Sequence, residues 1–305
     1  MEAKKGNKKI IIIAAVIIVA VIAAILLLFL FKNKETSYRL LKIFEVEGTA
    51  NVKRGSIGDI EPYANMVLES GDAVKLDTGK LTIRADEDKY IHLEDGTELK
   101  LTATGDATNS KTKIELMSGA ITNDIQNKLS LESSYEVNTP NSTMSVRGTI
   151  YRVWIYEENG IKYTKVTVFE GEVATRLVYA DGTVSDEEVS VKKGKEVLIY
   201  EDGKTTDYVG EPKDIDFSEL PESVLNLLKE KIEEDRDVSV TKEDIEQILH
   251  GPFRVNFMYN GTVFGSQTVE KGKCAEVPSL APAASGSWGF NFSTPIEKDT
   301  VIEWQ

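Results

Sequence analysis

Few residues in this sequence have side chains suited to catalysis. The 305 residues include two histidines, His92 and His250, and one cysteine, Cys274, without an H-E-x-x-H, C-x-x-C or G-x-S-x-G pattern. Zinc hydrolysis and the thiol or serine triads require such arrangements. A single cysteine cannot form an intramolecular disulfide, and we expect Cys274 to be buried and inert. The sequence therefore indicates no catalytic residue, no cofactor and no metal site.

Carboxylates are abundant, with 50 Asp and Glu residues in the chain. A pair of them could serve a glycosidase, but so large a number singles out none. Asp86, Glu87 and Asp88 could bind calcium, although the spaced ligands of an EF-hand loop are missing and a solvated turn fits better. No phosphate-binding loop is present. We predict a protein that is not an enzyme, with a carbohydrate-active enzyme as the weakest alternative.

The charge is divided unevenly along the chain. The net charge of −14 combines +5 in residues 1–34 with −19 in the remainder. An acidic body repels the phosphate backbone, so we expect no nucleic-acid partner.

An apolar run follows the basic N-terminal residues. Residues 10–31 are 22 consecutive residues drawn only from Ile, Val, Ala, Leu and Phe. As a helix this run would measure about 33 Å, enough to cross a hydrocarbon core of about 30 Å. A cleaved signal peptide would have a shorter apolar stretch and a small-residue cleavage site. We therefore predict a cytoplasmic tail at 1–9 and an uncleaved single membrane span at 10–31.

Flanking charges do not decide the orientation, because four basic residues lie close to each end of the run. Long domains cross the membrane largely regardless of charge, so we predict an extracytoplasmic C-terminal body in the cell membrane. Ala20 and Ala24 form a small-xxx-small pair that leaves a homodimer through the helix open. A lipid-facing surface is the favoured interpretation, since the pair lacks glycine.

The body, residues 38–215, has the pattern of an all-β domain. Glycines recur at intervals of 8–12 residues with β-branched runs between them, which is typical of a sandwich, barrel or solenoid. Asp95-Gly96, Asp181-Gly182 and Asp202-Gly203 supply positive-φ positions for tight hairpins. Residues 151–156 and 161–169 predict a hairpin with large side chains on both faces, so both faces should be covered.

The periodicity becomes helical at 216–250, which predicts a short helical linker. Ser218 is placed to cap a first helix with Pro221 near its start. Thr241 and Asp244 resemble a capping box for a second helix that ends before Gly251. A last β module at 253–305 then has about the minimal size of an independent domain.

The stretch from Val137 to Val153 resembles the hallmark of the FecR domain, named for the iron dicitrate transport regulator. The matching motif residues are Thr139, Pro140, Val146, Arg147, Gly148 and Thr149. Further matches, in family order, are residues 70–72, 116–119, 169–171 and 193–194. The resemblance runs from about Val46 to Tyr200. It implies an extracytoplasmic β-solenoid or sandwich-like domain, which in founding members takes part in transmembrane signalling with an outer-membrane transporter.

The resemblance has one departure. Founding members carry a cytoplasmic anti-sigma segment before the membrane helix, whereas only Met1–Lys9 precedes the apolar run here. Nine residues are too few to fold, so we expect no direct control of a sigma factor.

Residues 253–305 are similar to the Listeria–Bacteroides repeat, a small β-grasp-like module of surface proteins. The matching positions are Val255, Phe257, Gly261, Val269, Gly272, Val277, Pro278, Gly286, Pro295, Ile296, Asp299, Thr300 and Trp304. The usual Gly-x-x-Phe-x-Gly-Trp centre is shortened to residues 286–290. Such repeats often act as spacers on wall-associated proteins.

Several residues have both a structural and a functional interpretation. Arg147 could contact a ligand, but satisfying carbonyls at a turn that requires Gly148 is the favoured role. Trp154 and Trp304 are expected in the core, whereas Trp288, next to glycines, is the aromatic most expected to be exposed.

These observations predict a membrane-anchored extracytoplasmic binding or scaffold protein of the bacterial envelope. Its partner would be an envelope protein or glycan. The main alternative is a transmembrane signalling receptor that couples ligand binding to a partner protein.

Overall fold

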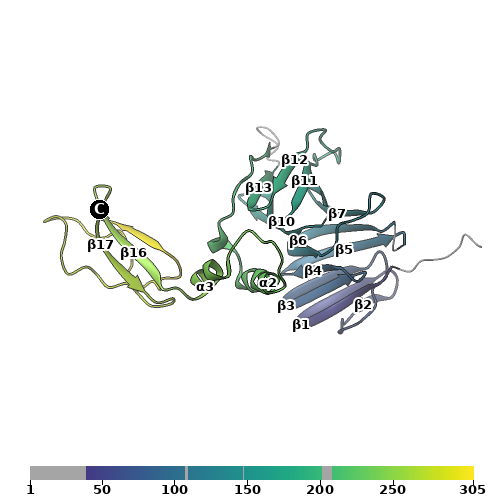
Figure 1. Cartoon of the computed structure of the whole chain (residues 1–305), viewed down its shortest axis with the longest axis horizontal. Coiled ribbons are helices and arrows are strands. Elements are labelled where there is room, and N and C mark those ends of the chain that lie inside the picture. The colour runs from purple at the N-terminus through teal and green to yellow at the C-terminus, as the bar shows by residue number, and fades with distance from the viewer. Residues whose placement is uncertain (1–38, 107–108, 147, 201–207) are drawn as a thin grey trace, which may run out of the picture.

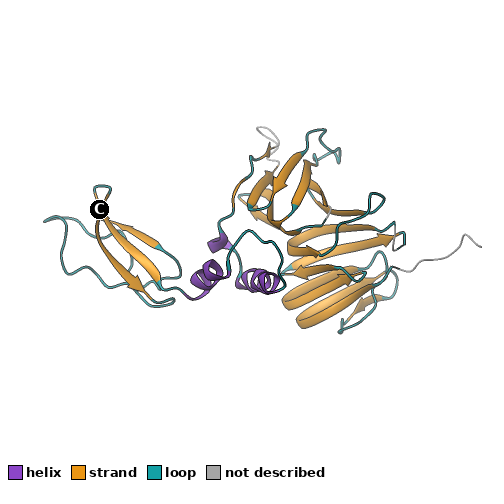
Figure 2. Ribbon diagram, viewed as in Figure 1, coloured by secondary structure: helices purple, strands orange, loops and turns teal. Residues whose placement is uncertain are grey.

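The computed structural model describes residues 39–106, 109–146, 148–200 and 208–305 (Figure 1). Strands predominate, as predicted, and short helices lie between a large β body and a small C-terminal module (Figure 2). Within the described ranges, no helix combines the length and apolar character needed to cross a membrane. The predicted span at 10–31, its Ala20 and Ala24 pair, and Arg147 lie outside those ranges.

In the described ranges, fifteen strands form the β body. They are β1 (Leu41–Arg54), β2 (Gly58–Ile60), β3 (Ala73–Ala85), β4 (Lys89–Leu93), β5 (Thr97–Thr104), β6 (Lys111–Ile125), β7 (Ser134–Thr139), β8 (Ser142–Val146), β9 (Ile150–Glu158), β10 (Ile161–Glu170), β11 (Glu172–Leu177), β12 (Val189–Lys192), β13 (Lys195–Tyr200), β14 (Tyr208–Val209) and β15 (Lys213–Asp214).

Long strands bend at glycines and thereby contribute to two layers. The first part of β3 pairs with β5 and its last part with β4, and the bend lies at Gly79, opposite Gly48 of β1. A Cβ on either glycine would come within 2.2 Å of a backbone oxygen, so only glycine fits. β6 divides in the same way at Gly119, pairing with β5 before it and with β4 and β9 after it.

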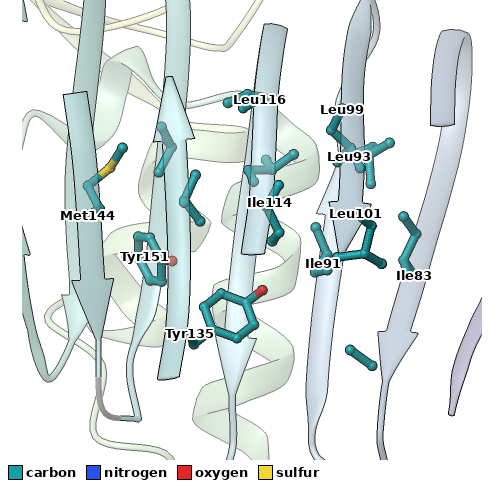
Figure 3. Packing of buried hydrophobic residues seen from close by; sticks show 14 of the residues in the cluster. Ile83, Ile91, Leu93, Leu99, Leu101, Ile114, Leu116, Tyr135, Met144 and Tyr151 are labelled. Atoms are coloured by element: carbon teal, nitrogen blue, oxygen red, sulfur yellow. The ribbon is translucent and has the colours of Figure 1, made fainter. Parts of the chain in front are cut away.

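The bends produce a two-layer body. One layer, here the helix-covered sheet, holds the first part of β1, the last parts of β3 and β6, and β4, β9, β10 and β13, with the short β14 and β15 paired to β13. The open sheet holds the other parts of those long strands with β2, β5, β7, β8, β11 and β12. Figure 3 shows side chains of the apolar core, among them Ile91, Ile114, Tyr135 and Tyr151.

Turn predictions had mixed outcomes. The hairpin of β9 and β10 is confirmed, and so is the turn at Asp181-Gly182 between the bridged residues Val178 and Val184. The Asp95-Gly96 prediction of a hairpin was wrong, because β4 and β5 do not pair with each other. Gly96 has a φ of +72°, but the turn carries the chain from one layer to the other. Asp202-Gly203 lies outside the described ranges.

The helical segment comprises the 3-10 helix η1 (Phe217–Glu219), α2 (Glu222–Glu233) and α3 (Lys242–His250). The predicted Ser218 cap was wrong: Asp216 caps η1 by accepting from the Ser218 amide, and α2 begins after Pro221 without a side-chain cap. The capping box at α3 is confirmed, since the Asp244 amide donates to Thr241 Oγ1 at 3.1 Å. Apolar residues of both helices pack against Ile150 and Phe169 at the end of the hairpin.

The C-terminal module contains β16 (Phe253–Tyr259), β17 (Thr262–Val269) and β18 (Thr300–Glu303) in the order β17-β16-β18, with β16 and β18 parallel. Its likeness to the Listeria–Bacteroides repeat stays a prediction. Two sequence expectations fail here. Cys274 is exposed, because the neighbouring Ala275 occupies the inward position. Trp288 is only 8% exposed, because its ring packs against Phe257 and Trp304 at centroid distances of 5.1 and 5.0 Å.

Candidate functional site

A row of polar side chains crosses the outer face of the helix-covered sheet. Residues directly opposite each other on neighbouring strands share one face, so the strand register aligns one residue from each of seven strands. The row consists of Glu45, Thr82, His92, Thr122, Arg152, Thr167 and Glu196. The residues between them along the strands, such as Ile83, Ile91 and Val153, point into the core.

The middle of this row is buried although it lies on an outer face. Thr82, Thr122 and Thr167 are at most 1% exposed, and Arg152 is 5% exposed. Residues of α2 line a groove together with residues of β1, β3, β4 and β6, so the helix lies over this part of the sheet. Trp154 lies further along the same face and is half-buried, so the prediction of a core position was wrong for this tryptophan.

The groove between α2 and the sheet has a volume of about 580 Å³. Cavities of this size accommodate small organic ligands. Its lining on the side of the sheet includes Phe44, Glu45, Lys80, Tyr90, His92, Thr122 and Glu94, the last directly after β4. On the side of the helix it includes Asn226, Glu230 and Lys231 of α2, and Glu234 directly after α2. We call this space the α2 groove.

A chain of hydrogen bonds fixes the orientation of His92. Thr82 Oγ1 donates to Glu45 Oε1 at 2.8 Å and lies 3.1 Å from His92 Nδ1. A hydroxyl has a single proton, so Thr82 must accept from His92, whose Nδ1 therefore carries the hydrogen. The other nitrogen, Nε2, then has a free lone pair and acts as an acceptor.

The surroundings keep His92 neutral. Burial lowers the pKa of the imidazole to about 4, and the positive charges of Lys231 and Lys80 act in the same direction against Asp124 and Glu45. At neutral pH the ring is uncharged, as the acceptor role of Nε2 requires.

Two buried polar atoms of the groove-lining residues have no hydrogen-bond partner among the described residues. They are His92 Nε2 and the hydroxyl oxygen of Thr122, which belong to directly paired residues of β4 and β6. Their lack of a partner also means that they do not bond to each other, so His92 does not activate Thr122 as a base activates a nucleophile. A buried polar group without a partner costs about 1–3 kcal/mol, which favours a role in binding.

The charges around the groove are compensated in place. Arg152 donates to both oxygens of Glu94 at 2.7 and 2.8 Å, and Lys80 lies 2.9 Å from Glu45. The Arg152–Glu94 pair is bidentate, so it holds both side chains in a defined orientation as well as balancing their charges. The Arg152 guanidinium also lies 5.1 Å from the centre of the Trp154 ring.

An ion-pair cluster holds the helical segment against the sheet. Asp124, which is fully buried, lies 3.3 Å from the Lys231 ammonium and 2.9 Å from the Arg236 guanidinium. Arg236 also contacts Glu170 at 2.9 Å. Burial acts to lower the pKa of Lys231, but the hydrogen bond with Glu234 and the charge of Asp124 outweigh it and leave that pKa raised. We call Asp124, Lys231, Arg236 and Glu170 the Asp124 clamp.

The family motif lies away from the groove. Gly148 has a φ of +103° where the chain passes from β8 in the open sheet to β9 in the helix-covered sheet, and Thr149 Oγ1 donates to the Glu172 carbonyl at 3.3 Å. The return crossing passes through Gly171, where a Cβ would lie 2.7 Å from the Gly148 oxygen. Val146 is buried at the end of β8. These positions serve the crossings between layers.

The Thr139 end of the motif forms another structural junction. Pro140 is exposed in the turn between β7 and β8, and the buried Thr139 and Asn141 flank it. Asn141 donates to the carbonyls of Lys162 and Ile199 at 3.0 and 3.2 Å, which joins this turn to β10 and β13. None of these contacts faces the α2 groove, so the groove and the motif are separate features.

No metal-binding cluster occurs within the described ranges, where no three His, Cys, Asp or Glu side chains are grouped to hold an ion. Sequence reasoning missed the groove. The alternation of polar and apolar residues at 80–94 and 120–124 is visible, but it also fits a strand with a solvated face.

Comparison with known proteins finds a family model that matches part of the body. Residues 72–174 match the family model described as FecR protein, which confirms the resemblance seen in the sequence. The matched span contains His92, Thr122 and Asp124, whereas Glu45 and α2 lie outside it.

Two solved structures from Parabacteroides distasonis, each titled "putative anti-sigma factor", show a distant similarity. One is 13% identical and covers 65% of this chain and 83% of its own, with a TM-score of 0.38. The other is 11% identical and covers 78% and 96%, with a TM-score of 0.35. None of the curated proteins compared with the chain matches it.

Proposed function

We propose that this chain, which carries the FecR match over residues 72–174, is a non-catalytic binding protein of the bacterial envelope. A single span at 10–31 would anchor it in the cell membrane with the N-terminus in the cytoplasm. The β body would be the recognition unit outside the membrane. The family match and the apolar run support this proposal.

One observation carries the binding role. The α2 groove has two buried polar atoms without a partner, on His92 and Thr122, beside charged groups that already satisfy one another. A ligand that supplied the missing hydrogen bonds would remove the cost of leaving them unmade.

A second candidate function is a signalling receptor. It is favoured by the position of α2, which forms one wall of the groove and is also fixed by the Asp124 clamp through Lys231. A ligand in the groove would therefore act on the helical segment as well as on the sheet. A receptor requires two states of that segment, with different affinities for the ligand.

The binding role is tested with the full chain in detergent. Fractionated envelope extracts should raise the melting temperature of the protein, because a ligand that binds only the folded state stabilises it. Asn226→Trp, which fills the groove from an exposed position on α2, should abolish this increase. Glu243→Trp, at an exposed position on α3, is the matched control. An increase that persists unchanged in Asn226→Trp would remove the groove from the proposal.

The enzyme alternative is tested by turnover on peptidoglycan and polysaccharides. We expect no sustained hydrolysis by the full chain. Sustained turnover that a single Asp or Glu substitution abolishes would establish an enzyme instead.

The topology is tested by fractionation and proteolysis. The full chain should separate with membranes, and protease added to intact spheroplasts should remove the body. A body protected until lysis would reverse the proposed orientation. An N-terminus that begins after residue 31 would show that the span is cleaved.

A further inference from the structure

The α2 groove also restricts the chemistry of its ligand. Each charged side chain named in its lining has a partner of opposite charge: Glu45 has Lys80, Glu94 has Arg152, and Lys231 contacts Glu230 and Glu234. A charged ligand would have to compete with these pairs. The free hydrogen-bonding capacity therefore lies in neutral groups.

The two free atoms form an adjacent acceptor and donor. His92 Nε2 can only accept, since Nδ1 carries the ring hydrogen toward Thr82. The Thr122 hydroxyl can donate and accept. Directly opposed residues of an antiparallel pair have Cβ atoms about 4.5–5.5 Å apart, so one ligand atom can reach both side chains.

Only some functional groups satisfy both atoms at once. A carboxylate accepts from Thr122 but cannot donate to His92. An ammonium could donate to both atoms, but it would bring a charge into a groove whose own charged side chains are already paired. A hydroxyl does both with a single oxygen. The groove is much larger than one hydroxyl, so its occupant should carry several such groups along the polar row.

Aromatic side chains form part of the groove wall. Phe44 and Tyr90 contact edge to face at 5.5 Å, and Phe44 is 43% exposed. An apolar ring face beside hydrogen-bonding groups suits a ligand with both C–H and O–H surfaces, as a cyclic polyol has.

We propose that the α2 groove binds a small, neutral, polyhydroxylated ligand of the sugar or cyclic polyol class, an inference that rests on the proposed binding role. One hydroxyl of the ligand accepts from Thr122 and donates to His92 Nε2. Both protein atoms are buried in the free protein, so a small displacement of α2 or of the lining side chains must accompany binding.

The test uses the full chain in detergent with ¹⁵N-labelled histidine. The chain has two histidines, and His250→Gln identifies the imidazole signals of His92. The Nε2 signal of the free protein should be that of an unprotonated nitrogen. D-glucose, N-acetyl-D-glucosamine and myo-inositol are the hydroxylated probes, and acetate and ethylammonium are the charged ones. At least one hydroxylated probe should shift the His92 signal saturably, and the charged probes should not.

Two threonine variants locate the effect. Thr122→Val removes the hydroxyl without removing a bond, so the protein should remain folded, while the probe should bind about tenfold more weakly, as loss of one hydrogen bond predicts. Thr167→Val is the matched control. The Thr167 hydroxyl lies on the same face of the sheet, is as deeply buried as that of Thr122 and also lacks a partner, but Thr167 does not line the groove.

Three results would overturn the inference. A His92 signal unmoved by every hydroxylated probe would mean that an ordered water alone bridges the two atoms. A larger response to a charged probe would give the ligand another chemistry. Equal affinities in the Thr122 and Thr167 variants would place the ligand elsewhere. In each case, stabilisation by envelope extract that Asn226→Trp abolishes would leave the proposed binding role standing.

Discussion

The β body and the C-terminal module bury different kinds of residue. The body buries ionic groups on its helix-covered face, including Asp124, Arg152, Glu196 and Lys231, which are at most 5% exposed. Residues 253–305, all of which are described, contain no buried charged or polar residue, and their core is apolar and rich in aromatics. Burying a charge costs free energy even when the charge is paired, so these ion pairs contribute little net stability to the fold. Their presence in the body therefore favours a role other than stabilisation.

The difference indicates that the buried polar groups of the body serve ligand recognition, whereas the aromatic core of the module serves its stability. Paired charges hold α2 in one position over the sheet and leave two polar atoms free in a defined geometry. The module has an aromatic cluster that stabilises it, and its buried polar atom without a partner, Asn256 Oδ1, lines neither the α2 groove nor the pocket beside Trp288. We therefore expect recognition in the body and a spacer role for the module.

The comparison is tested most strongly at the Asp124 clamp. Asp124→Ala leaves Lys231 and Arg236 without their buried partner, which should lower the free energy of unfolding of the body by about 3–5 kcal/mol. Urea unfolding of the full chain, followed by fluorescence of the body, measures the change.

Asp214→Ala is the control, because its pair with Lys195 is exposed and such pairs contribute about 0–1 kcal/mol. Similar losses for the two variants would show that α2 does not depend on the clamp.

The module should depend instead on Trp288. Trp288→Ala removes a buried ring that contacts Phe257 and Trp304, which should cost about 3–5 kcal/mol, most of the stability of so small a unit. The expected result is loss of the module's amide protection from hydrogen exchange while the body keeps its own. Loss of protection in both would contradict independent cores.

The pH dependence of the body should come partly from His92. The folded pKa of about 4 lies below the unfolded value of about 6.5, so the unfolded state binds the proton more readily. The stabilisation from the neutral ring is therefore complete above pH 6.5 and is lost as the pH falls toward 4. At pH 5 the loss is about 2 kcal/mol by linkage.

His92→Gln should flatten this part of the stability curve, whereas His250→Gln, at an exposed site on α3, should not. The same slope in His92→Gln would assign the effect to another group near the ring, such as Glu45, whose pKa is lowered in the folded protein although burial acts to raise it, because the hydrogen bonds from Lys80 and Thr82 outweigh burial.

The crossing at Gly148 should have a smaller effect. An L side chain at a φ of +103° is strained by about 1–2 kcal/mol, and a Cβ there would lie 3.2 Å from Lys128 Cα. Gly148→Val should therefore cost somewhat more than Gly182→Val, which has positive φ but open space around it. Thermal melts compare the two, and equal losses would show that the crossing tolerates the contact.

Periodic features of the sequence predicted the β body and the helical segment. Alternating apolar residues marked the β9–β10 hairpin, and Thr241 with Asp244 marked the start of α3, because both signals are local. The bends at Gly48 and Gly79 could not be predicted from the sequence. Each glycine is needed because a Cβ there would collide with the backbone of the other strand, and that strand pairing is not visible in the sequence.

The candidate site was beyond prediction for a related reason. The polar row depends on the register of seven strands, and its burial depends on α2, which begins 100 residues after Thr122 in the chain. Errors at Trp288 and Cys274 arose in the same way, since local glycines and residue type do not show which side chain faces a distant core.

The smallest expected effect on the β body comes from deletion of the whole C-terminal module. Deleting 253–305 should leave the melting temperature of the body nearly unchanged, because the body and the module have separate apolar cores. The contact between Lys271 and the Leu249 carbonyl at 2.8 Å joins the module to the end of α3, away from the Asp124 clamp. Stabilisation by envelope extract should also survive, because no groove-lining residue is removed. Calorimetry of the full chain and the deletion, each with and without extract, measures both effects. If the deletion destabilised the body by several degrees, the two regions would form one cooperative unit. If it abolished the extract effect alone, the module would hold the binding site and the groove would not.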